Sequence, residues 1–325
     1  MKASIAKSDR IYVAGHKGLV GSALLRSLGR NGYGNLLTAT HADLDLTDQA
    51  AVNAFFAAQR PDAVILSAAK VGGIVSNNRY PAEFIASNLM IQTNVIDAAW
   101  RNGTRKLVFM GTSCIYPREP AHQPITEDLL LTGPLETTNQ WYAVAKIAGI
   151  KMCEAYRRQY GFDAVSVMPA NLYGPGDYFD LENAHVIPAL MRKFHEAKVS
   201  GAPSVVVWGT GTPRREFLYV DDLADAVVFV MENYSENELV NIGTGEDISM
   251  GDLARKIADV VGFTGKLEFD TARPDGVARR ILDSSKLHKL GWCAHVGLDE
   301  GLALTYRWFA ENAATARLGE ASAAQ

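Results

Sequence analysis

Tyr142 and Lys146 place a phenol and an ammonium four residues apart in the segment Tyr142-Ala-Val-Ala-Lys146. Residues four apart on a helix lie on one face, so the two side chains are expected to be neighbours. A cationic lysine there would lower the pKa of the tyrosine and prepare the phenol for proton transfer near neutral pH. The pair alone is a weak signal, because this spacing also arises by chance. Its meaning depends on two glycine-containing segments upstream.

The first of these segments is Gly15-His-Lys-Gly18-Leu-Val-Gly21, which follows an apolar run at 11–14 that predicts a strand. A tight turn between a strand and a helix exposes free amide groups and a positive helix dipole, which suit a pyrophosphate. The alternative is a glycine-rich loop with no binding role. The position directly after the first strand favours a dinucleotide-binding loop.

The cofactor that this loop would hold is predicted to be NADP(H). Enzymes that use NAD usually place an acidic residue at the end of the second strand. Here the predicted strand at 36–40 is followed by His41, and no carboxylate occurs before Asp43. Lys17 and His41 could instead face a 2′-phosphate, although both could also be solvated surface residues. Asp45 and Leu46 are expected near the adenine, and Ala68 along the cofactor.

The second segment is Gly111-Thr-Ser-Cys-Ile-Tyr116, after a predicted strand at 106–110. If that strand extends through Cys114, then Thr112 and Cys114 share a face, because side chains two apart on a strand point the same way. Thr112 would bind a substrate carbonyl beside Tyr142, and Cys114 would place a thiol next to it. The alternative for Cys114 is a buried structural cysteine, the commoner fate of a lone thiol. Together the motifs predict an enzyme that moves a hydride and protons.

The elements that must position these residues alternate along the first half of the chain. Strands are predicted at 11–14, 36–40, 63–66, 106–110 and 164–168, and helices at 19–29, 48–59, 82–102 and 140–160. Thr47 is a candidate N-cap for the helix at 48–59. Apolar strands that alternate with helices predict a doubly wound α/β domain with a parallel sheet.

The second half has a looser pattern and predicts a smaller α/β lobe. Helices are expected at 186–197, 221–232 and 298–312, a strand at 205–208, and a capping box at Ser249 for a helix that runs to 261. The predicted division gives residues 1–172 to the first domain, with 216–244 returning to it. Residues 173–215 and 245–318 would form the second.

Composition excludes several classes of function. The 325 residues carry a net charge of −4 without charge blocks, which argues against nucleic acid or an anionic membrane as the main partner. No apolar run reaches membrane-spanning length, and the first ten residues lack the apolar core of a signal peptide. Three widely spaced cysteines predict neither a disulfide framework nor a metal site. We expect a cytoplasmic protein without a metal.

The motifs resemble those of the extended short-chain dehydrogenase/reductases over about residues 11–309. Within that family the chain is most similar to the members that make GDP-L-fucose from GDP-4-keto-6-deoxy-D-mannose. Beyond the segments above, the resemblance rests on Ala68-Ala-Lys-Val-Gly-Gly73, Asn171-Leu-Tyr-Gly-Pro175, His185-Val-Ile-Pro-Ala189, Val207-Trp-Gly-Thr-Gly-Thr-Pro213 and Arg273-Pro-Asp-Gly276. The family usually has serine at the position of Thr112, and often arginine at those of Lys17 and His41.

The resemblance implies a Rossmann-like domain, a substrate lobe and a two-stage reaction. Cys114 and His185 would invert C3 and C5 as base and acid. Tyr142, Thr112 and Lys146 would stabilise the oxyanion, and NADPH would then reduce the C4 ketone. For the GDP-sugar, the implied contacts are Lys193, Trp208, Arg215 and Asp275. For NADP(H), they are Gly15, His16, Lys17, Gly18, Leu19, Val20, Gly21, His41, Asp45, Leu46, Ala68, Met110, Gly111, Thr112, Ser113, Tyr142, Lys146, Pro169, Ala170, Asn171, Leu172 and His185. The helices at 82–102 and 140–160 would form a homodimer interface.

Other activities of this fold stay open at this point. A 4-epimerase, a 4,6-dehydratase or a simple ketosugar reductase could share the Tyr142 and Lys146 pair. Dehydratases of the family carry an Asp-Glu pair where this chain has Ser113-Cys114, which counts against dehydration. A non-catalytic NADP-sensing regulator is a different class of protein, but it has no need of Thr112, Tyr142 and Lys146 together.

Overall fold

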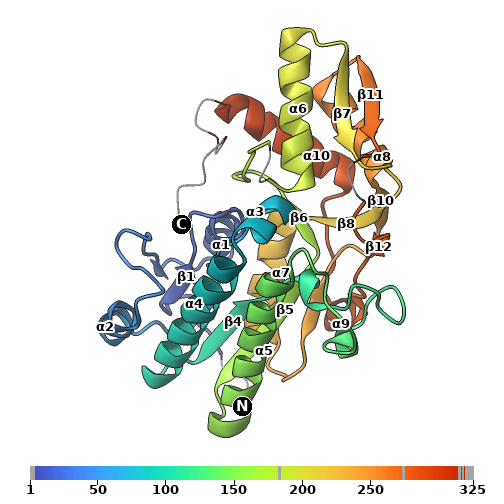
Figure 1. Ribbon diagram of the computed structural model, residues 1–325. Helices are drawn as coiled ribbons and strands as arrows, with labels where there is room; N and C mark the ends of the chain where they lie inside the picture. The colour runs from blue at the N-terminus through green and yellow to red at the C-terminus, as the bar shows by residue number, and fades with distance from the viewer. Residues whose placement is uncertain (1–3, 182–183, 273–274, 314–315, 317, 319–325) are drawn as a thin grey trace.

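A six-stranded parallel sheet forms the centre of the first half of the molecule (Figure 1). The structure is a computed structural model that describes residues 4–181, 184–272, 275–313, 316 and 318. The strand order is β2-β1-β3-β4-β5-β9, and each neighbouring pair is parallel. The strands are β1 (Ile11–Ala14), β2 (Leu36–Leu37), β3 (Ala63–Leu66), β4 (Lys106–Met110), β5 (Asp163–Pro169) and β9 (Val240–Ile242).

Helices cover both faces of this sheet, as the continuous burial of its strands requires. On one face α4 and α5 run side by side with α2 beside α4, and on the other α1 packs against α7 (Figure 1). The doubly wound architecture predicted from the alternating pattern is therefore confirmed. The helices are α1 (Leu19–Arg30), α2 (Gln49–Gln59), α3 (Ile74–Arg79), α4 (Pro81–Arg101), α5 (Gln140–Tyr160), α7 (Val220–Asn233) and α9 (Ser285–Leu290).

Among the described residues, the remaining strands form two smaller sheets, which surround a separate apolar core together with three further helices. The strand β8 (Arg214–Tyr219) pairs with β6 (Asn171–Tyr173), β10 (Asp247–Ser249) and β12 (Arg279–Arg280). The strand β7 (Ser204–Trp208) pairs with β11 (Lys266–Asp270). The helices α6 (Val186–Ser200), α8 (Met250–Val261) and α10 (Leu298–Asn312) contribute apolar faces to this core. We call this part the second unit and the part around the six-stranded sheet the first unit.

Three local predictions are wrong for identifiable reasons. The strand predicted at 36–40 ends at Leu37, because Thr40 turns the chain by donating its hydroxyl to Asp43 at 2.6 Å. The N-cap of α2 is Asp48 and not Thr47, since the Asp48 carboxylate accepts the amides of Ala50 and Ala51. The strand predicted at 106–110 is confirmed, but its conditional extension through Cys114 is wrong, because Ser113–Ile115 forms a 3-10 helix. The cap at Ser249 is confirmed, because its hydroxyl accepts the amide of Asp252.

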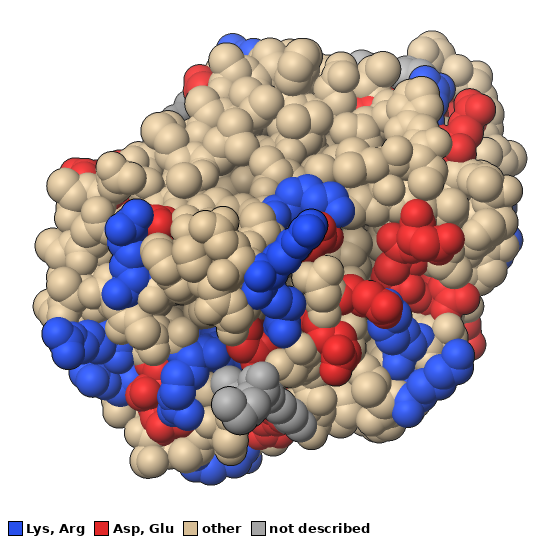
Figure 2. All heavy atoms as spheres, turned by 90° about the horizontal axis from the view of Figure 1, so that it is seen from below, with Lys and Arg blue, Asp and Glu red and all other residues tan. Residues whose placement is uncertain are grey.

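Charged side chains are mixed on the face that Figure 2 shows. In this view Lys and Arg side chains lie mainly toward the left and centre and Asp and Glu side chains mainly toward the right, with uncharged residues over most of the upper half. Within the described part of the chain, no helix is both long and apolar enough to cross a membrane.

Candidate functional site

The glycine loop lies at the point where the order of strands in the six-stranded sheet reverses. From β1 the chain moves outward to β2 and then returns to β3 on the other side of β1. In open parallel sheets, ligands bind at the carboxyl ends of the strands beside such a switch point. The loops that follow β1 and β3, which begin at Gly15 and at Ser67, meet there, and the Ser67 hydroxyl donates to the Ala14 carbonyl at 2.6 Å.

The loop fits a dinucleotide-binding turn, because its glycines allow a close packing of backbone that any side chain would prevent. Gly15 has a φ of +84°, and a Cβ on it would lie 2.8 Å from the Cα of Ala68. A Cβ on Gly21 would lie 2.0 Å from the Gly15 carbonyl oxygen. The N-cap of α1 is Gly18, and no side chain caps that end. The first amides of α1 are therefore left for an anionic group.

Other predicted cofactor residues follow the neighbouring strands at the same edge of the sheet. Met110 ends β4, and the Gly111 amide donates to the Val167 carbonyl of β5 at 2.8 Å. Pro169 ends β5, and the Ala170 amide donates to the Ile242 carbonyl of β9 at 2.9 Å. The Asn171 side chain donates to the Glu216 carbonyl at 2.8 Å, which joins this edge to β8. The carboxyl ends of β4, β5 and β9 therefore lie together at one edge of the sheet.

Around the predicted adenosine end, the two carboxylates are held by their own turns. Asp43 accepts from Thr40, and Asp45 accepts the amide and hydroxyl of Thr47, each at 2.8 Å. His41 Nδ1 lies 3.9 Å from an Asp45 oxygen. Burial is the main cause that lowers the pKa of His16, and hydrogen bonds from Thr40 are the main cause that lowers the pKa of Asp43. The exposed Lys17 lies close enough to lower both pKa values further.

The turn at Thr112, Ser113 and Cys114 brings the predicted hydroxyl and thiol together without a strand. The Thr112 hydroxyl accepts the Cys114 amide at 3.3 Å, which starts the 3-10 helix. The Cys114 thiol is half-buried and accepts the Asn139 side-chain amide at 3.2 Å. Cys114 also lies close enough to Tyr142 to contribute to the raised pKa of that phenol. Cys114 therefore lies near Thr112 and Tyr142 through this turn and not through a shared strand face.

Lys146 is buried beneath Tyr142 on α5, as the spacing predicts. Its Nζ donates to the Met110 carbonyl at 2.8 Å and lies 5.9 Å from the centre of the Tyr142 ring. Burial lowers the pKa of Lys146 from its usual value of 10.5 to about 7. The surrounding protein raises the pKa of Tyr142, although part of the side chain stays exposed. The expected lowering of the tyrosine pKa is therefore wrong for the protein alone, because burial outweighs an amine that is itself easily neutralised.

The lowered pKa of Lys146 makes the stability of the cofactor-free protein depend on pH. Below about pH 7 both the folded and the unfolded states carry the proton, so the cost of a buried ammonium is fully present. Between about pH 7 and 10.5 the unfolded state binds more protons, so this cost decreases as pH rises. We expect Lys146→Met to flatten the rise of the urea midpoint across this range. Lys151→Met, at an exposed position of α5, is the control, and equal slopes in both variants would contradict the assignment.

His185 lies in the second unit, at the N-cap of α6, and its side chain makes no capping hydrogen bond. The ring keeps solvent access, while the protein around it lowers its pKa by desolvation. The sequence placed His185 at the start of this helix, and the structure does so too.

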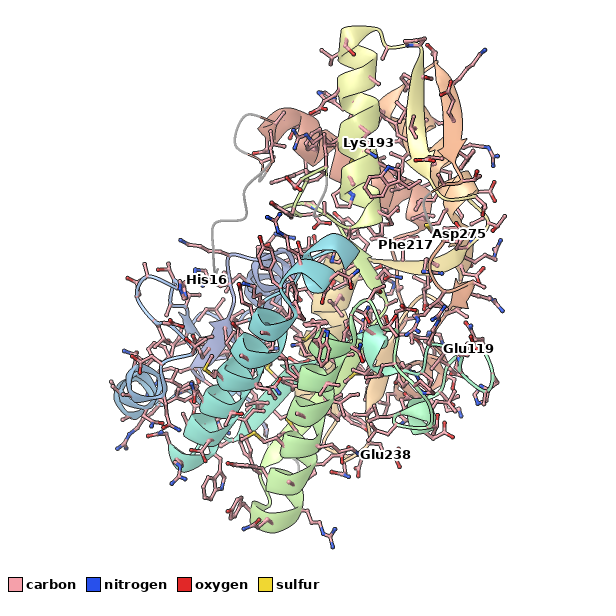
Figure 3. All side chains as sticks on the ribbon, in the orientation of Figure 1. His16, Glu119, Lys193, Phe217, Glu238 and Asp275 are labelled. Carbon is pink, nitrogen blue, oxygen red and sulfur yellow. The ribbon has the colours of Figure 1, made fainter. Side chains whose placement is uncertain are left out.

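The four predicted substrate residues lie together in the second unit. Figure 3 shows Lys193 on α6 and Asp275 near the strands of the same unit. Lys193 Nζ lies 4.8 Å from the ring centre of Trp208. Asp275 accepts the amide of Thr210 at 2.9 Å and its hydroxyl at 2.6 Å, which fixes the loop after Trp208. A cation, an indole ring and a carboxylate are thus held near one another.

Arg215 lies between this cluster and the turn at Thr112, Ser113 and Cys114. A Cβ on Gly276 would lie 3.0 Å from an Arg215 guanidinium nitrogen, so the segment after Asp275 packs directly on Arg215. Burial, followed by the neighbouring Arg280, lowers the pKa of Arg215, and Cys114 and Asp275 act in the opposite direction. The arginine of the second unit therefore lies within electrostatic range of the thiol of the first.

Sequence reasoning missed two residues that contact this turn, Asn139 and Arg280. Asn139 directly precedes the helix predicted at 140–160, and the sequence indicates no role for it beyond that position. Its Oδ1 is buried and has no hydrogen-bond partner among the described residues, while its Nδ2 holds the Cys114 sulfur. Arg280 donates to the Ser113 carbonyl. Nothing in the sequence pairs positions 113 and 280.

A dinucleotide loop at the switch point and a hydroxyl, phenol and lysine beside it define an α/β oxidoreductase of the short-chain dehydrogenase/reductase type. The model of the protein family described as "NAD dependent epimerase/dehydratase family" matches residues 11–243 of this chain. The chain belongs to this family and, within it, to the GDP-L-fucose synthases.

Relatives support this placement over nearly the whole chain. The probable GDP-L-fucose synthase 1 of Oryza sativa subsp. japonica is 60% identical over 312 residues, which cover 96% of this chain and 95% of the relative. The GDP-L-fucose synthase of Escherichia coli is 54% identical and covers 94% of this chain and 97% of its own. The solved GDP-L-fucose synthetase of Naegleria fowleri has a TM-score of 0.89 at 31% identity, with 97% of each chain covered.

Proposed function

We propose that this protein converts GDP-4-keto-6-deoxy-D-mannose into GDP-L-fucose, by inversion at C3 and C5 followed by reduction at C4 with NADPH. The observation that carries the proposal is the thiol of Cys114 beside the phenol of Tyr142, within range of Arg215. A reductase needs the phenol, but only an epimerase has a use for a thiol at the same carbonyl. The relatives named GDP-L-fucose synthase support the GDP-sugar as the substrate.

NADP(H) is the cofactor in this proposal, and its binding residues follow the glycine loop. A second Naegleria fowleri structure of the same enzyme, 30% identical to this chain, has NADP bound. When bound, NADPH supplies the hydride that reduces C4. Gly15 and Gly21 allow the close backbone packing that forms the turn, and the uncapped end of α1 would offer amide groups to the pyrophosphate. Lys17 and His41 are assigned to the adenosine end.

The first stage of the proposed reaction moves protons at C3 and C5. The ketone at C4 acidifies both carbons, and Cys114 removes a proton while His185 supplies one from the other side. Asn139 holds the sulfur through its hydrogen bond at 3.2 Å. The Tyr142 and Thr112 hydroxyls donate to the developing oxyanion, and the charge of Lys146 stabilises it. The thiolate form of Cys114 is the base in this step, and Arg215 lies within electrostatic range of the sulfur.

The second stage uses Tyr142 as the acid. After inversion, Tyr142 protonates the C4 oxygen as the carbon is reduced, and Lys146 supplies positive charge below the ring. The raised pKa of Tyr142 suits this step, because the phenol keeps its proton until the alkoxide forms.

Substrate recognition is assigned to the second unit. Arg215 and Lys193 would contact the diphosphate, which a guanidinium can bind through two parallel hydrogen bonds. Trp208 offers an exposed aromatic surface beside Lys193, and Asp275 lies at the far side of the same loop.

One assay tests the whole proposal. The protein is incubated with GDP-4-keto-6-deoxy-D-mannose and NADPH in deuterated water, and the sugar product is identified. The proposal expects stoichiometric oxidation of NADPH, deuterium at C3 and C5, and GDP-L-fucose. A simple reductase would consume NADPH without deuterium incorporation, and a 4-epimerase or a regulator would not consume it stoichiometrically.

The choice of cofactor gives a separate prediction. Lys17→Ala should raise the KM for NADPH at least about tenfold and leave that for NADH nearly unchanged, because an exposed charged contact to a phosphate contributes on the order of 1 kcal/mol or more. Lys289→Ala, an exposed position on α9, is the control. Equal effects of Lys17→Ala on both cofactors would mean that Lys17 does not contact the 2′-phosphate.

We also propose that the protein acts as a cytoplasmic homodimer joined through α4 and α5. Trp141 and Val144 lie on one face of α5 with 42% and 41% of their surfaces exposed, and Met90 of α4 is 44% exposed. Neighbouring apolar side chains of this size are typical of an interface. Sedimentation equilibrium at two concentrations tests the dimer.

The division into units follows the two apolar cores. The first core contains α7 and β9, and the second contains α6, α8 and α10. We propose that residues 1–172 and 216–244 bind the cofactor and that residues 173–215 and 245–318 bind the substrate, although the paired strands β6 and β8 cross this boundary and pack in the second core. Leu282, Leu287 and Trp292 of the later segment pack into the first core, which ties the units together.

A further inference from the structure

We infer that Arg280 is a positioning residue that holds the catalytic turn at Cys114 against the substrate-binding strand of the second unit. Arg280 lies on β12 and is only 9% exposed. Its Nη1 donates to the Ser113 carbonyl at 2.7 Å, and its Nη2 donates to the Pro117 carbonyl at 3.1 Å. These two carbonyls lie on either side of Cys114 in the sequence, so one guanidinium spans the turn that carries the thiol.

Neighbouring arginines show that this arrangement is specific to Arg280. On the paired strands β8 and β12, Arg279 lies opposite Arg214 and Arg280 lies opposite Arg215. Arg214 and Arg279 are exposed and share the carboxylate of Asp247. Arg280 is buried and gives its donors to main-chain carbonyls. A planar guanidinium can reach two oxygens at once, whereas a lysine is a single point charge.

The chain after the turn is attached to the same strand by main-chain hydrogen bonds. The Ile125 amide donates to the Ile281 carbonyl at 2.9 Å, and the Asp283 amide donates to the Ile125 carbonyl at 2.9 Å. The Gln123 side chain donates to the Arg279 carbonyl at 2.8 Å. Arg280 extends this attachment from residues 123–125 to the turn itself, close to the reacting groups.

The consequence is a fixed relation between thiol and substrate. Arg215, opposite Arg280 on the adjacent strand, interacts electrostatically with both Arg280 and Cys114. Arg280 therefore sets where the thiol lies relative to the residue proposed to hold the diphosphate. A misplacement of about 1 Å at a reacting group can cost on the order of 10²-fold in rate. This inference rests on the proposed role of Cys114.

Three variants test the inference: Arg280→Ala, Arg280→Lys and, as the matched control, Arg279→Ala. In Arg280→Ala we expect kcat for deuterium incorporation at C3 and C5 to fall about 10²-fold, with the KM for the GDP-sugar within about twofold of the wild type. Arg280→Lys should recover only part of the rate. Guanidinium chloride at a few millimolar should raise this kcat at least about tenfold in Arg280→Ala and should leave it unchanged in Arg279→Ala.

Hydrogen–deuterium exchange of the backbone supplies a readout that does not depend on turnover. The peptide that contains residues 113–117 should exchange faster in Arg280→Ala, and guanidinium should slow it again. Unchanged exchange in this peptide would overturn the inference, as would a raised KM with an unchanged kcat, which would make Arg280 a substrate ligand. If the wild-type protein incorporates no deuterium into the sugar, the proposed function fails, while the peptide result still decides whether Arg280 holds the turn.

Discussion

Tyr142→Phe should reduce the rate of NADPH oxidation with the ketosugar by about 10²- to 10⁴-fold, the usual contribution of a positioned acid or base. The substitution removes the proton donor and keeps the aromatic ring at the same position of α5. Without the phenolic proton, the alkoxide at C4 must form unprotonated or take its proton from water. Binding of NADPH should persist, because the glycine loop and Lys146 are unchanged.

Stopped-flow measurement of a single turnover checks this prediction, and fluorescence titration checks the binding of NADPH. Tyr160→Phe is the matched control, since Tyr160 lies on the same helix and stacks on Trp100 at a ring-centre distance of 4.0 Å. Near-normal turnover in Tyr142→Phe would remove Tyr142 from the mechanism. A loss of cofactor binding would show that the phenol mainly positions the nicotinamide.

Cys114→Ser should nearly abolish exchange of the C3 and C5 hydrogens with deuterated water, because a hydroxyl is a far weaker base than a thiolate. The decrease should again lie within about 10²- to 10⁴-fold. The bound ketone can still be reduced, so the product should be a 6-deoxy sugar with C3 and C5 unaltered. Mass spectrometry and proton NMR of the released sugar distinguish this product from GDP-L-fucose. Cys293→Ser, at an exposed cysteine, is the control.

His185→Asn should also impair exchange and leave the binding of NADPH intact. The control on the same helix is His195→Asn, because the His195 ring is engaged with the Tyr306 hydroxyl at 3.1 Å. The epimerase assignment would be abandoned if Cys114→Ser and His185→Asn both formed the fucose product at the wild-type rate.

The active site illustrates why sequence patterns find some residues and miss others. Tyr142 and Lys146 lie on one uninterrupted helix, so their spacing fixes their relation. Asn139 lies just before that helix and approaches Cys114 across 25 positions of the chain. Arg280 reaches the Ser113 carbonyl across 167 positions. A hydrogen bond to a main-chain carbonyl leaves no mark in the identity of the accepting residue, so a single sequence cannot reveal it.

Local periodicity and turn chemistry determined much of this protein by sequence alone. Buried apolar runs such as 63–66 and 106–110 can be satisfied only as central strands, and the glycines at 15 and 21 are required where backbones meet. Tertiary structure alone decided three features of the site. Cys114 lies on a 3-10 turn held by Asn139 and not on an extended strand, and burial rather than the nearby lysine sets the pKa of Tyr142. The Cys114 thiol lies within electrostatic range of Arg215 because β8 and β12 bring the second unit to the first. Such long-range packing depends on the whole chain.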